Sequence, residues 1–114
     1  MTLCRSDQPA VFWVRARGFV ARPPLAAALD QARLFGEAHR GGWFYVADLR
    51  GSWGFDPRNV SLLRGIHRLP NLRAYVVLAP GAMQRLLLRL GAPVVAPDAI
   101  VPTAAEAWEF CERA

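Results

Sequence analysis

The sequence contains no lysine: its fourteen basic residues are all arginines, and they are spread over the whole chain. Nine acidic residues leave a net charge of +5. A basic excess of this kind is typical of proteins that bind anionic partners such as nucleic acid or a lipid surface. A chain rich in Arg, Ala, Gly, Pro and Leu but without Lys also reflects a GC-rich coding bias. Because the arginines are not clustered, we favour that second interpretation.

Long hydrophobic runs are also missing. No apolar run approaches the roughly 20 residues that a membrane-spanning helix needs, and the longest, residues 74–80, has the length of a strand. The first residues lack the apolar core of a signal peptide, so we expect a cytoplasmic protein. The two cysteines, Cys4 and Cys111, lie near opposite ends of the chain and outside any CxxC motif. We expect both to be free thiols.

Signatures of catalysis are equally scarce. The sequence has no nucleophile elbow, P-loop, GxGxxG motif or metal-ligand spacing. Its two histidines, His39 and His67, each lie near the end of a predicted helix, where the helix dipole favours them. Asp48 and Asp56 are candidates for a pair of catalytic carboxylates, but Asp56 is better explained as a helix N-cap and Asp48 as the partner of an arginine such as Arg50. We therefore expect no enzymatic activity, no cofactor and no metal.

What the sequence does have is an alternation of strand and helix patterns. The runs at residues 43–47 and 72–79 are apolar throughout, which indicates strands buried on both faces. Residues 11–20 alternate only in part, which predicts a half-exposed strand with Trp13 on its polar side. In chain order, strands are predicted within residues 1–10, at 11–20, 43–47 and 72–79, and at either 94–95 or 100–101.

Helical periodicity predicts four helices between and after these strands. Thr103 and Glu106 have the spacing of a capping box, which marks the start of the last helix. We therefore predict one α/β domain over residues 1–114, with a mixed, mostly parallel sheet of four to five strands flanked by four helices. The helices are expected at residues 23–39, 57–68, 82–90 and from 103 onward. The third carries an apolar stripe of Met83, Leu86, Leu87 and Leu90.

The most distinctive stretch is the corner expected after the strand at residues 43–47. Asp48 is predicted to end that strand at its carboxyl edge, and Gly51 and Gly54 permit a sharp turn. Asp56 then caps the next helix, with Pro57 at its first position. Open α/β sheets commonly bind their ligands where the carboxyl end of a strand meets a helix N-terminus. This edge is therefore the predicted functional site.

This order of elements resembles the STAS domain, the fold of the anti-sigma-factor antagonists. Asp48-Leu49-Arg50-Gly51 is similar to the Asp-Leu-Ser-Gly motif of that family, and Asp56 falls where a second motif, Asp-Ser-Ser-Gly, opens the second helix. The closer resemblance is to the divergent SpoIIAA-like branch, whose aromatic corner and Ala- and Glu-rich terminal helix are similar to residues 53–57 and 100–110. Pro-Arg-Asn at residues 57–59 replaces the phosphorylatable serines and glycine. The resemblance therefore implies a STAS-like fold that has lost its phospho-switch.

The resulting hypothesis is a non-enzymatic STAS-like regulatory module that acts by protein–protein contact, because exposed Trp and Arg are typical of interface hot spots. Trp13 and Arg15 are the candidates for self-association into a homodimer. Two other hypotheses stay open: a small or lipid-like ligand in an apolar pocket beside the corner, and polyanion binding through the arginines. The residues predicted to contact a partner or ligand are Arg50, Ser52, Trp53, Phe55, Asp56, Arg58 and Asn59.

Overall fold

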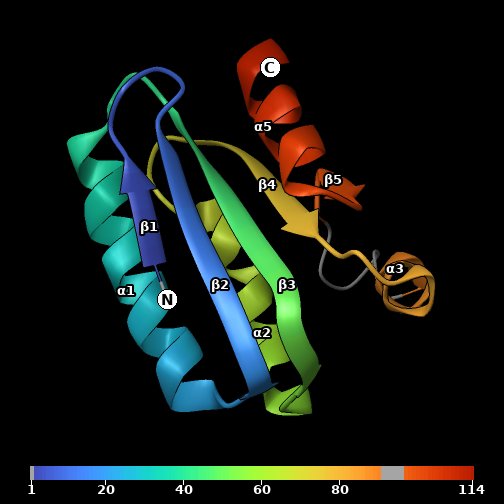
Figure 1. The fold of residues 1–114 in the computed structure, drawn as a ribbon. Helices are drawn as coiled ribbons and strands as arrows, with labels where there is room; N and C mark the ends of the chain where they lie inside the picture. The colour runs from blue at the N-terminus through green and yellow to red at the C-terminus, as the bar shows by residue number, and fades with distance from the viewer. Residues whose placement is uncertain (1, 91–96) are drawn as a thin grey trace.

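The computed structural model describes residues 2–90 and 97–114, except for the side chains of Thr2, Trp53, Phe55 and Leu87. Within these residues, five strands form one sheet in the order β1-β2-β3-β4-β5, which is also their order along the chain (Figure 1). β1 is antiparallel to β2, and the other neighbouring strands are parallel. The predicted mixed, mostly parallel α/β sheet is thus confirmed. The strands are β1 (Thr2–Arg5), β2 (Val11–Val20), β3 (Trp43–Phe55), β4 (Leu72–Leu78) and β5 (Ala99–Val101).

Helices cover both faces of this sheet. α1 and α2 pack on one face and α5 on the other, while α3 lies at the side of the molecule (Figure 1). There, the side-chain amide of Gln84 donates a hydrogen bond to the carbonyl of Leu49 in β3, at 3.4 Å. No helix in the described ranges is long and apolar enough to cross a membrane. The helices are α1 (Arg22–Ala38), α2 (Val60–Arg64), α3 (Ala82–Leu90) and α5 (Ala104–Arg113).

Each face of the sheet carries its own hydrophobic core. Successive residues of a strand point to opposite faces, so Trp43 and Tyr45 of β3 belong to the core under α1 and α2. The intervening Phe44 and Val46 belong to the core under α5. β4 divides in the same way, and its residues from Ala74 onward are buried. The prediction that these two strands are buried on both sides is confirmed.

A glycine allows α1 to approach the sheet closely. The indole Nε1 of Trp43 donates a hydrogen bond to the carbonyl of Pro70 at 2.7 Å, and Gly36 of α1 lies against both groups. A Cβ atom at this position would lie 2.5 Å from the Pro70 oxygen and 2.7 Å from the Trp43 nitrogen. Any larger residue would therefore push the helix off the sheet.

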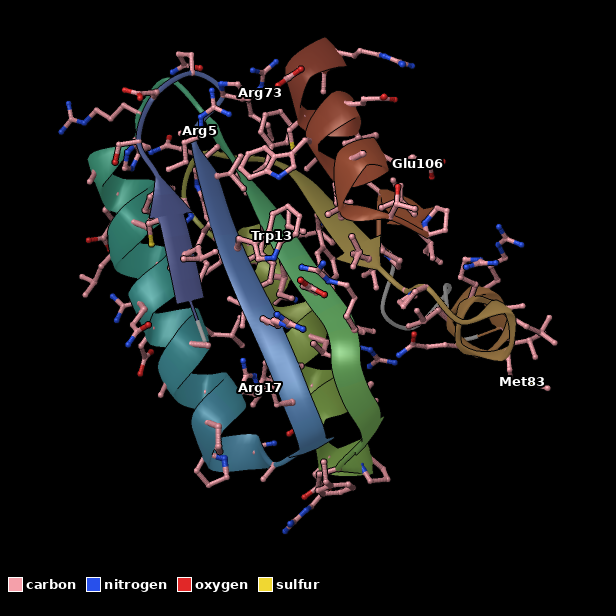
Figure 2. All side chains as sticks on the ribbon, viewed as in Figure 1. Arg5, Trp13, Arg17, Arg73, Met83 and Glu106 are labelled. Carbon is pink, nitrogen blue, oxygen red and sulfur yellow. The ribbon has the colours of Figure 1, made fainter. Side chains whose placement is uncertain are left out.

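Trp13 is buried, so the prediction of an exposed side chain was wrong. Its side chain lies on the face of β2 that α5 covers, and only 5% of the residue is exposed (Figure 2). Its ring stacks on Trp108 of α5 with 5.1 Å between centroids, and its Nε1 donates to Oδ2 of Asp48 at 3.0 Å. The covering helix, α5, is far from β2 in the sequence. The local alternation of residues 11–20 therefore gives no indication that this helix covers Trp13. The predicted self-association surface therefore has no exposed indole at this position.

β3 continues to Phe55, so the prediction of a corner after Asp48 was also wrong. Asp48 lies in the middle of the strand, opposite Arg15 of β2, and the pairing of the two strands continues to Val20 opposite Phe55. β3 contains more residues over this stretch than β2, and two register shifts absorb the difference. Gly51 and Gly54 adjoin these irregularities, where glycine accommodates bulges without ending the strand.

Further along the chain, the helix predicted over residues 57–68 is divided into three short pieces: α2 and two 3-10 turns, Pro57–Asn59 and Ile66–Arg68. The N-cap predictions are confirmed at both sites. Asp56 accepts a hydrogen bond from the backbone N–H of Arg58 at 2.9 Å, and Thr103 accepts one from that of Glu106 at 3.2 Å.

The remaining predictions have mixed outcomes. The last strand, β5, contains residues 100–101, whereas the alternative at 94–95 lies outside the described residues. Both cysteines are free thiols, as expected. The described residues of the apolar stripe on α3 lie at the surface: Met83, Leu86 and Leu90 are 67%, 50% and 71% exposed.

Candidate functional site

A cavity of about 920 Å³ lies between the sheet and the helices that follow β2, β3 and β4. Its wall is formed by the carboxyl-terminal parts of these strands together with α1, α2 and α3. The lining is mostly apolar, with residues such as Val14, Leu25, Ala47, Leu63 and Leu88. Sites for small molecules typically measure about 300–1,000 Å³ and are lined in this way. The cavity therefore has the size and character of a ligand site.

The floor of the cavity consists of residues that are buried in the core. Tyr45 of β3 and Tyr75 of β4 contribute two aromatic rings, which meet edge to face with 5.6 Å between centroids. Burial raises the pKa of both phenols, and the neighbouring Tyr45 raises that of Tyr75 further. Both side chains therefore stay neutral at physiological pH. Val77 and Ile66 complete an apolar floor.

The rim carries the charge. Three arginines, Arg15, Arg17 and Arg50, are among the lining residues, and no acidic side chain is among those that the structure describes there. Arg17 is exposed and lies beside Gly51, the residue opposite it in β3 (Figure 2). Phe19 and Met83 are also exposed lining residues, so the rim is both basic and apolar.

Arg50 is bound to a buried carboxylate. Its guanidinium contacts both oxygens of Asp48, with 2.6 Å between Nη2 and Oδ2, and its backbone N–H donates to Oδ1 at 3.1 Å. Trp13 supplies one more donor. Burial raises the pKa of the Asp48 carboxyl, but the hydrogen bonds from Arg50 and Trp13 outweigh it and hold the pKa below its usual value. Asp48 is therefore an ionised structural group and not a proton donor.

A second pair lies just beyond the end of β3. The guanidinium of Arg58 contacts both oxygens of Asp56, again with 2.6 Å between Nη2 and Oδ2. The hydrogen bonds from the side chain and backbone of Arg58 lower the pKa of the Asp56 carboxyl. Arg22 of α1 closes this end of the strand by donating to the carbonyl of Arg58 at 2.9 Å. Asp56 thus acts as a cap, as predicted.

The structure divides the predicted contact residues into separate groups. Arg50, Ser52 and Asn59 line the cavity, whereas Asp56 and Arg58 do not. Asn59 is fully buried and donates a hydrogen bond from Nδ2 to the carbonyl of Val20 at 2.9 Å, so it offers no surface to a protein partner. The side chains of Trp53 and Phe55 lie outside the described residues. The protein-contact role of residues 50–59 stays a prediction.

Sequence reasoning missed the residues that form most of the cavity wall. Tyr45, Tyr75 and Val77 belong to strands predicted as buried on both faces, and a buried strand gives the same apolar pattern whether it meets a helix or a cavity. The one available signal was the proposal of an apolar pocket beside the predicted corner. The cavity does include Arg50 and Ser52, and a ligand in it stays a prediction.

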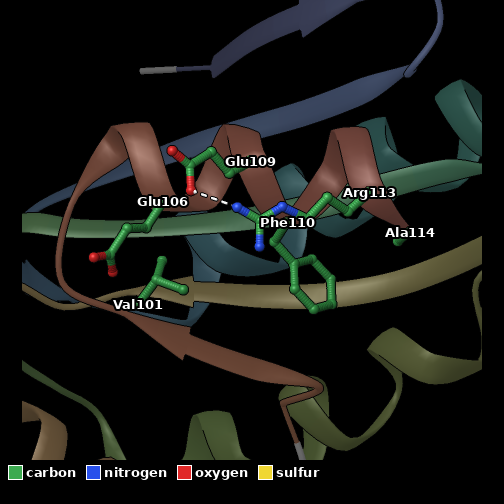
Figure 3. Close-up of a pocket in the computed structure, with 6 residues that line it drawn as sticks. All are labelled: Val101, Glu106, Glu109, Phe110, Arg113 and Ala114. Carbon is green, nitrogen blue, oxygen red and sulfur yellow. Dashed lines mark hydrogen bonds and ion pairs between the residues drawn. The ribbon is translucent and has the colours of Figure 1, made fainter.

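A second pocket of about 400 Å³ lies along α5 beside Val101 of β5 (Figure 3). Glu109 and Arg113 form an ion pair across one helical turn there, with 3.2 Å between Nη2 and Oε2. Exposed pairs of this spacing are ordinary features of helix surfaces. This pocket is a surface groove beside a solvated helix face, and the larger cavity is the better candidate site.

Comparison of the chain with models of known protein families, with characterised proteins and with solved structures finds no match. The candidate site therefore rests on its own geometry.

Proposed function

We propose that the chain is a non-catalytic binding module of STAS-like fold, which holds a small, largely apolar molecule in the cavity between the sheet and α1, α2 and α3. The observation that carries this proposal is the cavity itself, with its volume of about 920 Å³ and its mostly apolar lining. An apolar cavity of this volume lies within the range of small-molecule sites, and burying apolar ligand atoms against its wall would stabilise a complex.

One feature supports the STAS-like assignment. The strands pair in their order along the chain, with an antiparallel β1 at one edge and α5 on the face opposite α1 and α2, which agrees with the element order that suggested the resemblance. Because Pro57 stands where the family has its phosphorylatable serine, we propose that ligand occupancy, and not phosphorylation, is what this module responds to.

Native mass spectrometry of the purified protein tests the proposal. We expect either a bound molecule of a few hundred daltons that leaves under denaturing conditions, or stoichiometric uptake of dodecan-1-ol as a neutral apolar probe. Burial of an alkyl chain supplies about 0.8 kcal/mol per CH₂ group, which makes such a probe a sensitive one. A bare chain that takes up no apolar probe, neutral or charged, would rule out the proposed function.

A variant with a filled cavity, compared with a surface variant, tests the same proposal. Ala47 lies on the cavity side of β3, so we expect Ala47→Phe to occupy the space and reduce uptake of dodecan-1-ol at least tenfold. Ala105→Phe on the exposed face of α5 is the control and should bind normally. Circular dichroism and thermal melting check that both variants fold. Val14→Phe, on the neighbouring strand and also in the lining, replaces Ala47→Phe if overpacking unfolds it. Undiminished uptake by a folded cavity variant would contradict the proposal.

A further inference from the structure

We infer that the ligand is an anionic amphiphile, a molecule with one acidic head group and a long apolar chain, and that Arg17 binds the head group. This inference rests on the proposed function and names its ligand class. The charged side chains described around the cavity are all cationic. An anion at this rim meets no repulsion from a lining carboxylate and is attracted to the arginines.

Arg17 is singled out by what the other arginines do. Of the other two arginines in the lining, Arg50 is held by Asp48 and Arg15 is only partly exposed. Arg58 is held by Asp56 outside the cavity. Arg17 has no ion pair with an acidic residue in the described part of the chain, and it is exposed. An arginine offers a planar fork of donors that matches the geometry of a carboxylate or phosphate.

The neighbouring strand leaves room for this side chain. Gly51 is opposite Arg17, and a Cβ atom there would lie 3.4 Å from Cγ of Arg17 and 3.1 Å from the carbonyl oxygen of Ala16. The distance to the Ala16 oxygen is tighter than ordinary van der Waals contact, and the distance to Cγ of Arg17 is at its lower limit, so a side chain at position 51 would lie directly against the stem of the arginine. The glycine therefore leaves space beside Arg17 on the neighbouring strand.

The remainder of the cavity accounts for the apolar part of the ligand. Beyond the rim, the lining is mostly aliphatic and includes the two neutral tyrosines, Tyr45 and Tyr75, together with the uncharged polar side chains of Ser52, Asn59 and Gln84. A compact polar anion would leave this surface uncovered, and a polyanion would place further charges against it at a high cost in desolvation. A single charge followed by an alkyl chain satisfies both regions of the cavity.

Calorimetric titration with dodecanoate and with dodecan-1-ol, below the concentration at which dodecanoate forms micelles, separates the head group from the chain. We expect dodecanoate to bind more tightly than the alcohol. Loss of a charge-assisted pair should make Arg17→Gln bind dodecanoate about tenfold more weakly while its affinity for the alcohol stays within twofold. Dodecyl phosphate is a third probe, and it distinguishes a phosphate head group from a carboxylate one.

Arg40→Gln is the matched control. Arg40 is an exposed arginine in the turn before β3, outside the cavity lining, and the substitution removes the same charge from the chain. A general effect of net charge would weaken dodecanoate equally in both variants and would overturn the assignment of Arg17. Equal affinities of the wild type for the alcohol and both anions would overturn the ligand class while leaving the proposed function intact. Failure of all three probes to bind would instead count against the proposed function itself.

Discussion

β3 and the turn that follows it contain two aspartate–arginine pairs of nearly identical geometry. In each pair the carboxylate accepts hydrogen bonds from the backbone N–H and the guanidinium of the arginine two residues later. The distance from Nη2 to Oδ2 is 2.6 Å in both. The first pair, Asp48–Arg50, lies within the strand, and the second, Asp56–Arg58, begins the 3-10 turn beyond it.

The two pairs differ in their surroundings. The side chains of Asp48 and Arg50 are 0% and 40% exposed, and Trp13 is a further donor to Asp48. Those of Asp56 and Arg58 are 13% and 78% exposed. A buried carboxylate loses its hydration, so its partners must compensate for that loss. Water can replace the partners of a surface pair, which therefore contributes little to stability. The spacing of aspartate and arginine determines the local geometry, and burial determines what the pair contributes energetically.

The largest effect is expected from removing the buried carboxylate. Asp48→Ala leaves the indole N–H of Trp13 without its buried acceptor and Arg50 without its counter-charge. We expect the free energy of unfolding to fall by about 3 kcal/mol. Urea denaturation followed by tryptophan fluorescence measures it. A loss no larger than that of the surface variant Asp56→Ala would show that burial does not set the energetic contribution of these pairs.

Acid should affect the two pairs unequally. Both carboxyls have lowered pKa values in the folded protein, so each contributes stability that is present above its unfolded pKa of about 3.9 and is lost as the pH falls through its folded pKa. We expect wild-type stability to decrease below about pH 4. Asp48→Asn should flatten this decrease more than Asp56→Asn does. Urea midpoints measured between pH 2 and pH 7 check the order, and identical profiles for the two variants would refute it.

The smallest effect is expected at the surface pair. Asp56→Ala removes the N-cap of the 3-10 turn and releases Arg58 into solvent, where water replaces the lost partner. We expect a decrease in melting temperature well below half of that caused by Asp48→Ala. Added salt should make this decrease in melting temperature smaller still, because salt screens exposed charges. Arg64→Ala, a substitution on an exposed residue of α2, is the control for ordinary surface changes.

Sequence patterns predicted an element correctly where the residues that determine it lie close together in the chain. β4 is an apolar run that is buried on both faces. The N-cap of α5 at Thr103 could be predicted from the capping-box spacing of Thr103 and Glu106. The Asp48–Arg50 pair could also be anticipated, because the two residues are close in the sequence. These features depend on side chains within a few positions of each other, which is the range that sequence reasoning covers well.

Features that depend on distant contacts could not be predicted in this way. Trp13 is buried by Trp108, which follows it by most of the length of the chain. Gly51 and Gly54 suggested a turn, but pairing with β2 keeps that stretch in the strand. The cavity is hardest of all to predict, since the same apolar residues form a packed core or a cavity wall according to how closely the covering helices approach.

The strand order has a consequence for the assembly of the protein. Because each strand pairs with the one before it in the chain, the sheet can grow in the order in which a ribosome makes it, and α1 and α2 can dock as they emerge. The opposite face of the sheet is covered later, because Phe44 and Val76 present an uncovered apolar surface until α5 has been made. Chaperones that recognise such surfaces would therefore meet this face of the nascent chain, while the face that forms the cavity is already covered.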